Sequence, residues 1–166
     1  MKIPIFLVIF VFFYRAIAAQ DLYVAPDGCP EGLGTLDSPL DVVTAFTDTN
    51  RVIPGTTVWF REGVYEISVL KNRNHVHGTK DNPVIWRALP HNRVTLHGRM
   101  VIYQDDFWLW GFEIEGSDQT GVKIHGGNSV KLINLIVYDH AKSGIFVSPN
   151  GGRRELYGNI IVTTQA

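Results

Sequence analysis

Short runs of apolar and β-branched residues, broken by turn-forming residues, make up most of the chain after Asp21. Four such runs lie at residues 56–60, 84–86, 94–96 and 107–114, and Gly, Pro, Asn and Asp separate them. This pattern is typical of short strands joined by tight turns. Only residues 41–46, where an aspartate precedes an apolar cluster, have the pattern of a short capped helix. The sequence therefore predicts an all-β protein.

A repeat with a period of 23 residues runs through the C-terminal half of the chain. It superposes the pairs Leu109 and Leu132, Phe112 and Leu135, Ile114 and Val137, Gly121 and Gly144, Val122 and Ile145, and Ile124 and Val147. A further copy is predicted 25 residues later, where Tyr157 answers Leu132, Asn159 answers Asn134, Ile160 answers Leu135 and Val162 answers Val137. A weaker, earlier copy places Trp86 on Leu109 and Ala88 on Gly111.

The length of this repeat favours a coil with one turn per repeat. A propeller blade needs four strands and about 40 residues. A leucine-rich repeat would need an asparagine and a leucine where Ser117 and Gln119 stand. In a coil, each strand would stack about 4.8 Å from its counterpart. Its sharp turns would require a left-handed or similarly strained residue, a position predicted for Gly111, Asn134 and Asn159.

Residues 1–19 have the pattern of an export signal. Lys2 precedes an apolar run from Ile3 to Phe13, and small residues follow in an A-x-A-like context. The run is shorter than the roughly 20 residues that cross a bilayer. We therefore expect a secreted, periplasmic or surface protein that begins near Gln20 and has no membrane partner after cleavage.

The composition of the mature chain limits the classes of partner that it can bind. Without Lys2 and Arg15, 13 basic residues stand against 16 acidic ones, so no basic field suggests nucleic acid. Cys29 is the only cysteine, which excludes an internal disulfide, and we expect it to be buried.

Several segments carry a resemblance to a known family. Asp-Leu-Tyr-Val-Ala-Pro-Asp-Gly stands at 21–28, and Pro-Gly-Thr-Thr-Val-Trp-Phe-Arg-Glu-Gly-Val-Tyr stands at 54–65. Together with residues 34–40 and 78–88, they resemble the N-terminal cap and first coils of exported right-handed parallel β-helix proteins. These proteins form the pectate-lyase-like superfamily, and the nearest members are polysaccharide lyases of the alginate lyase and chondroitinase B type.

The resemblance implies a solenoid with a cap at residues 20–52 and coils at residues 53–166. The coils are expected to be incomplete, because nothing resembling a C-terminal cap is present. In the resembled lyases the catalytic lysine and arginine and the calcium-binding acids lie in later coils, so none is carried over to this chain. The resemblance allows a calcium ion, although no cofactor is evident from the residues, and the chain is expected to be inactive by itself.

Candidate functional residues follow from strand alternation after Gly121. Inward Val122 and Ile124 would leave Lys123 and His125 facing outward, and Phe146 and Ser148 would face outward one coil later. The loop before the second of these strands adds Asp139, His140 and Lys142. In the resembled enzymes this face borders the substrate groove. An acidic-polysaccharide lyase needs a cation that offsets a uronate carboxylate and a base that removes the adjacent proton.

Other residues support alternative interpretations. Trp108 and Trp110 would face outward, where indole rings stack on sugars or pack under a loop. Asp118 and Asp139 lie in adjacent loops and suggest the two carboxylates of a hydrolase, although they are offset by two residues. His75 and His77 could form a metal pair, but no third ligand is evident, so the metal stays unknown.

Three function classes remain open. The first is a polysaccharide lyase or another enzyme that acts on a polysaccharide, which could be acidic. The second is a glycan-binding or adhesive β-helix without catalysis, and the third is a structural surface or phage-fibre-like module. Fold analogy alone ranks them in this order.

Overall fold

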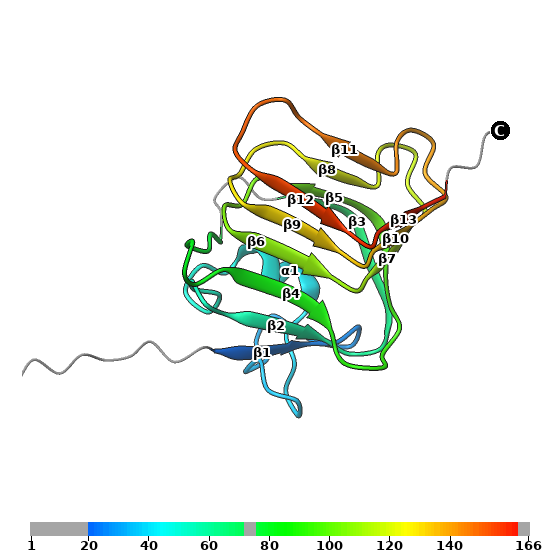
Figure 1. The fold of residues 1–166 in the computed structure, drawn as a ribbon. Coiled ribbons are helices and arrows are strands. Elements are labelled where there is room, and N and C mark those ends of the chain that lie inside the picture. The colour runs from blue at the N-terminus through cyan, green and yellow to red at the C-terminus, as the bar shows by residue number, and fades with distance from the viewer. Residues whose placement is uncertain (1–19, 72–75, 163–166) are drawn as a thin grey trace, which may run out of the picture.

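The computed structural model describes residues 20–71 and 76–162, so the predicted export signal at 1–19 and His75 lie outside the described residues. The chain winds through successive coils whose strands pair in parallel (Figure 1). This confirms the predicted parallel β-helix. No helix in the described part of the chain is long and apolar enough to cross a membrane.

One face of the coil is a parallel sheet, here called sheet A. In the described residues it holds β1 (Asp21–Val24), β2 (Thr57–Phe60), β4 (Val84–Ala88), β6 (Phe107–Trp110), β9 (Val130–Ile133) and β12 (Arg154–Tyr157), in this spatial order. Each strand comes from the next coil along the chain (Figure 1).

The other sheet, called sheet B, bends into two halves. The long strands β3 (Gly63–Lys71) and β5 (Val94–Ile102) run through the corner between the halves. The start of β5 leads to β7 (Glu113–Glu115), β10 (Ile136–Val137) and β13 (Ile160–Ile161), and its end leads to β8 (Val122–Ile124) and β11 (Ile145–Val147). The described coils therefore have three sides.

Glycine is required where β5 turns this corner. Gly98 has a φ of +129°, and a Cβ atom there would lie 2.7 Å from the backbone nitrogen of Ser68 in the neighbouring coil. The strand pair shifts register at this point, between Glu66 and Ser68. The bend thus depends on a residue without a side chain.

The register confirms most of the predicted repeat. Leu109 pairs with Leu132, Ile114 with Val137 and Val122 with Ile145, and Trp86 lies beside Leu109. The last copy was misplaced by one residue, because Leu156, not Tyr157, pairs with Leu132.

The misplaced copy results from matching one asparagine with another. Asn134 does adopt a left-handed conformation, with a φ of 50°, but in the next coil Gly158 takes that position, with a φ of 60°. Asn159 instead bridges two coils. Its amide nitrogen donates to the carbonyl oxygen of Leu132 at 3.0 Å, and its amide oxygen accepts from the backbone N–H of Leu135 at 2.9 Å. Asn159 therefore stabilises the stack through its side-chain hydrogen bonds and does not adopt the left-handed backbone conformation.

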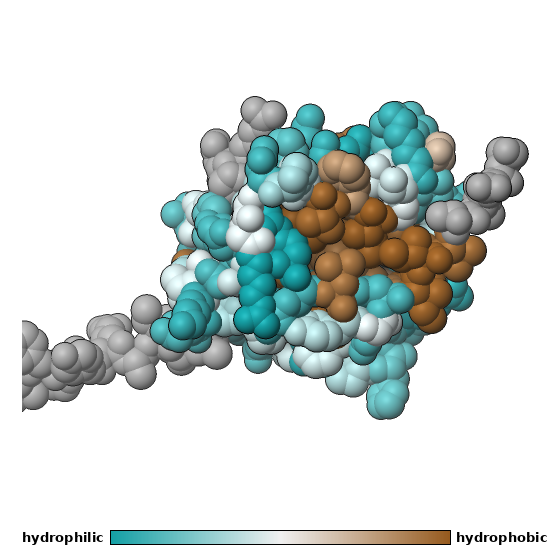
Figure 2. All heavy atoms as spheres, turned by 45° about the horizontal axis from the view of Figure 1, so that its top comes forward, coloured by the Kyte–Doolittle hydropathy of each residue, from teal (hydrophilic) through white to brown (hydrophobic). Residues whose placement is uncertain are grey.

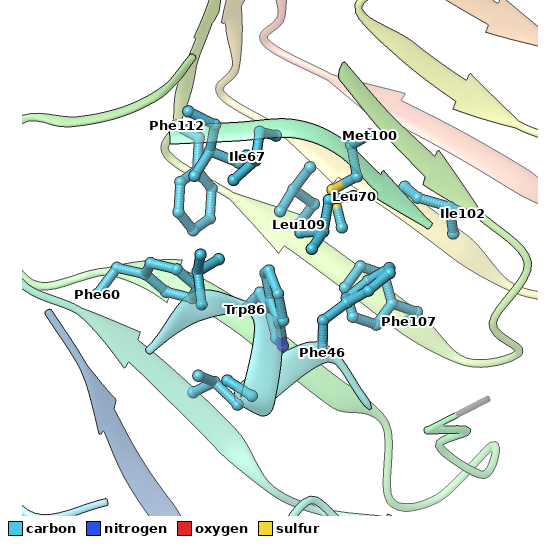
Figure 3. Close-up of a cluster of buried hydrophobic side chains, with 14 of the residues drawn as sticks. Phe46, Phe60, Ile67, Leu70, Trp86, Met100, Ile102, Phe107, Leu109 and Phe112 are labelled. Carbon is cyan, nitrogen blue, oxygen red and sulfur yellow. The ribbon is translucent and has the colours of Figure 1, made fainter. Parts of the chain in front are cut away.

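Inward side chains form one continuous core, with large aromatic rings in the first coils (Figure 3). Phe60 contacts both Trp86 and Phe112 with ring centroids 4.9 Å apart. The predicted helix is present as α1 (Val42–Thr47), where the Asp41 carboxylate caps two backbone N–H groups. Phe46 of α1 packs edge-on against Trp86, with ring centroids 5.2 Å apart. The region expected to form a cap therefore contributes side chains to the core of the coils.

Cys29 is exposed, which contradicts its expected burial. Its backbone N–H donates to the carbonyl oxygen of Pro39, so the loop is held through its main chain. The Cys29 side chain is therefore exposed to solvent, although the apolar character of cysteine had suggested that it would be buried.

The last coil of the described residues presents apolar side chains at its outer edge (Figure 2). β11, β12 and β13 are the terminal strands of their sheets. Leu156 and Ile161 are 44% and 46% exposed, although their counterparts Leu132 and Val137 are fully buried. Ile145, which was expected to be buried, is only partly covered for the same reason.

Leu135 tests the inward assignment of the core. It is fully buried, whereas the neighbouring Ile136 is 38% exposed. We expect Leu135→Ala to lower the free energy of unfolding by about 2–5 kcal/mol, because the cavity is enclosed. Ile136→Ala should lower the free energy of unfolding clearly less. Chemical denaturation measures both, and equal losses would contradict the assignment.

The apolar edge should cause self-association, since unpaired strands recruit other chains. We expect the protein produced from Gln20 to Ala166 to form oligomers that light scattering detects after size-exclusion chromatography. Ile161→Lys should shift it towards the monomer. Val64→Lys, at an exposed position of the first coils, should not. A monomeric parent protein would contradict this prediction.

Candidate functional site

The site is built on the outer face of β8 and β11, where alternation is as predicted. Val122 and Ile124 are buried, and Lys123 between them faces outward. Phe146 of β11 lies beside Lys123 in the parallel register. The Lys123 ammonium lies 5.5 Å from the centroid of the Phe146 ring. A cation and an exposed aromatic ring therefore share this face.

A hollow of about 320 Å³ opens beside these two residues, at the corner of sheet B. Its lining consists of Arg99, Gln119, Thr120, Lys123, Lys142, Ser143 and Phe146. Three of these residues are cations, and none of the described residues in the lining is an aspartate or glutamate. We call this feature the basic hollow. Its charge suits an anionic ligand.

Stacked loops position the polar part of the basic hollow. The backbone N–H of Lys142 donates to the carbonyl oxygen of Gln119 at 3.3 Å, and that of Ala141 donates to Ser117 at 2.9 Å. The Lys142 ammonium also donates to the side-chain oxygen of Gln119 at 2.6 Å. The loops before β8 and β11 therefore continue the coil-to-coil pairing and hold Lys142 above the hollow.

Arg99 completes the basic hollow and was not among the sequence candidates. It follows the bend at Gly98 in β5. Its Nε atom is buried and has no hydrogen-bond partner within residues 20–71 and 76–162. The apolar alternation of Met100 and Ile102 matches that of Val122 and Ile124, but this register sets Val101 beside Lys123. The repeat by itself therefore did not point to Arg99.

His140 lies apart from this face. It is 5% exposed, and its Nε2 atom is 3.1 Å from the carbonyl oxygen of Ile114. Because a carbonyl only accepts, Nε2 carries the proton and donates. The imidazole packs against Gly121, where a Cβ atom would lie 2.3 Å from Nε2. Burial lowers the pKa of His140 below its ordinary value, so the neutral ring is favoured.

The other candidates on this side are more scattered. His125 packs edge-on against Tyr103, with ring centroids 5.0 Å apart. Ser148 follows β11 and donates its backbone N–H to Ile124. Asp139 is exposed with a φ of 56° and does not line the basic hollow. Asp118 lines a neighbouring hollow of about 450 Å³ that shares Arg99.

Trp108 and Trp110 lie on a different face. Both face outward from β6 in sheet A, each against a cation, while the basic hollow lies on sheet B. The structure thus brings together Lys123, Lys142 and Phe146 and separates them from the two tryptophans.

Metal ligands do not gather on the described part of the chain, where no group of three or more His, Cys, Asp or Glu side chains could hold an ion. His77, one half of the suggested metal pair, has its Nδ1 atom 3.1 Å from the Asp105 carboxylate. The calcium ion that the family resemblance allows stays an expectation.

Comparisons with known proteins agree with the fold. No protein-family model matches the sequence. The chain is 31% identical over 94 residues to pectate lyase PEL9 of Emericella nidulans, covering 54% of this chain and 21% of that protein. It is 28% identical over 160 residues to pectate lyase L of Paenibacillus polymyxa, covering 88% of this chain and 35% of that protein. The chain therefore spans only a minor part of these relatives.

Solved structures share the architecture at lower identity. Pectate lyase Pel9A matches with a TM-score of 0.54 and 19% identity, over 86% of this chain and 46% of that one. A GH136 lacto-N-biosidase from Eubacterium ramulus matches with a TM-score of 0.60 and 16% identity, over 89% of this chain and 31% of that one. The first of these proteins is a lyase and the second is a glycosidase, so the fold alone does not determine the reaction.

The burial of His140 predicts a pH dependence of stability. Its pKa is lowered in the folded protein, so the unfolded chain takes up the proton first as the pH falls. This contribution to stability is complete above about pH 6.5 and is lost below it. His140→Gln should flatten the dependence of unfolding free energy between about pH 7 and pH 5, whereas His125→Gln at an exposed position should not. Chemical denaturation across this range measures both variants, and parallel curves would contradict the assignment.

Proposed function

We propose that this chain, which is similar to pectate lyases in sequence and shares their parallel β-helix fold, binds an acidic polysaccharide in the basic hollow as part of a secreted polysaccharide lyase. The observation that carries this proposal is the meeting of Arg99, Lys123 and Lys142 around one hollow. The predicted export signal at residues 1–19 supports secretion, since a polymeric substrate lies outside the cell.

The charges of the hollow suit the chemistry of β-elimination. In a uronic acid, a base removes the proton on the carbon beside the carboxylate. The electron pair forms a carbon–carbon double bond, and the glycosidic oxygen leaves with the other half of the polymer. Negative charge builds up on the carboxylate during this step, and nearby cations stabilise it. Arg99, Lys123 and Lys142 line the basic hollow and would supply this positive charge.

Arg99 is the residue best suited to hold the carboxylate. Its planar guanidinium can offer two parallel N–H groups to the two oxygens of one carboxylate. The buried Nε atom has no partner among the described residues, so a ligand would meet the terminal amino groups of the guanidinium. Phe146, which is 43% exposed, offers a ring against which the apolar face of a sugar can pack.

The same lining argues against glycoside hydrolysis in this hollow. A glycosidase places two carboxyl groups on opposite sides of the scissile bond. Asp118 and Asp139, the pair that the sequence suggested, do not line the basic hollow, and Asp139 is absent from the neighbouring one as well. Elimination is therefore the reaction that the charge distribution favours.

Binding to polygalacturonate tests the proposal. In affinity electrophoresis, Arg99→Gln and Lys142→Gln should each weaken retention roughly tenfold, the usual effect of losing one charge-assisted hydrogen bond. Added salt should also weaken the retention of the parent protein, because it screens the charges of the hollow. Arg93→Gln is the matched control, because Arg93 pairs with Glu113 on another part of the surface. Unchanged retention in both hollow variants would overturn the proposal.

A further inference from the structure

The outer face of sheet A carries a column of large side chains along the axis of the coil. One residue of each strand contributes, and the parallel register places them in line: Tyr23, Trp59, Arg87, Trp110, Ile133 and Tyr157. We call this feature the aromatic column. At about 4.8 Å per strand, it extends over about 24 Å. Its members are only partly buried, or exposed at the last strand.

Arg87 lies at the centre of the column, between two indole rings. Its guanidinium carbon is 4.5 Å from the centroid of the Trp59 ring and 4.1 Å from that of Trp110. Trp59 is held in place by a hydrogen bond from its indole N–H to the Asp21 carboxylate at 2.9 Å. This sandwich fixes the plane of the guanidinium.

Within the described residues, no carboxylate forms an ion pair with Arg87. Its Nε atom is buried, and no described residue accepts a hydrogen bond from it or forms an ion pair with the guanidinium. By contrast, Arg51 pairs with Asp48 and Arg93 with Glu113. The rings hold the guanidinium in place, and its terminal amino groups could donate to an external anion.

A second cation lies beside the column. Lys131 pairs in register with Trp108, and its ammonium is 4.3 Å from the centroid of that indole ring. Its contact with Glu155 is long, at 3.9 Å. The outer face of sheet A therefore carries aromatic rings and two cations, with the carboxylates of Asp21 and Glu155 at its two ends. Aromatic residues and arginine are enriched at binding surfaces.

We propose that the aromatic column is a second binding surface for the acidic polysaccharide, separate from the basic hollow. Sugar rings would pack on Trp59 and Trp110, and Arg87 would hold a carboxylate between them. The choice of polymer rests on the proposed function. A surface on another side of the coil lets one protein hold two stretches of polymer, which raises the retention of the protein on its substrate.

Tryptophan fluorescence tests this surface directly. Trp59, Trp108 and Trp110 are partly exposed on sheet A, whereas Trp86 is buried at 1% exposure. Titrating the protein with oligogalacturonate should change its emission, and fully methyl-esterified oligomers should give a response at least fivefold weaker. Arg87→Gln should weaken the apparent affinity about tenfold. Trp110→Phe keeps a ring at the site and should weaken it less.

The controls separate the two surfaces. Arg99→Gln combined with Lys142→Gln should leave the fluorescence titration unchanged while it weakens electrophoretic retention. If the parent protein is retained through the basic hollow but shows no fluorescence response, the second surface fails and the proposed function stands. If the response is lost in Arg87→Gln while the hollow variants are retained normally, the proposed function of the hollow fails. If Arg87→Gln lowers only the melting temperature and leaves the titration unchanged, the column is structural and the inference is wrong.

Discussion

Hydrogen bonding between the backbones of successive coils is the constraint on which the rest of this structure depends. Each strand donates to and accepts from the strand one turn away, so every side chain lies directly beside its counterpart in the next coil. Inward positions must then be apolar in all coils at once, and outward positions become columns of neighbours. Both the buried core and the two proposed binding surfaces are consequences of this single register.

The sequence predicted this register well where residues of one chemical class repeat. Leu109, Leu132 and their inward neighbours were found because apolar side chains recur with the period of the coil. The predicted register of the last coil was wrong by one residue. Glycine and asparagine both adopt the left-handed conformation, and the prediction aligned Asn159 with Asn134, whereas Gly158 takes that position. Loop side chains were less predictable. The burial of His140 depends on the space above Gly121, and the exposure of Cys29 depends on a loop held by its main chain.

The candidate site shows the same division. Lys123 and Phe146 could be paired in advance, because strand alternation fixes which side chains face outward. Arg99 could not be found from the strongest part of the repeat, since it lies in a coil where the corner of sheet B has no loop and the pattern is harder to align. Column neighbours on sheet A became apparent only once the register was known. Their cation–ring contacts join residues more than 20 positions apart in the sequence.

The corner beside the basic hollow differs in length from coil to coil. In β5 the chain crosses it within one continuous strand at Gly98, whereas in the next two coils loops at residues 116–121 and 138–144 separate the strands on either side. Both arrangements leave the pairing of the flanking strands intact. The corner is therefore a place where insertions and deletions are tolerated by the fold, because they add residues outside the ladders. Because residues of both loops line the basic hollow, a change of loop length there would reshape the hollow while the aromatic core and the register stay the same.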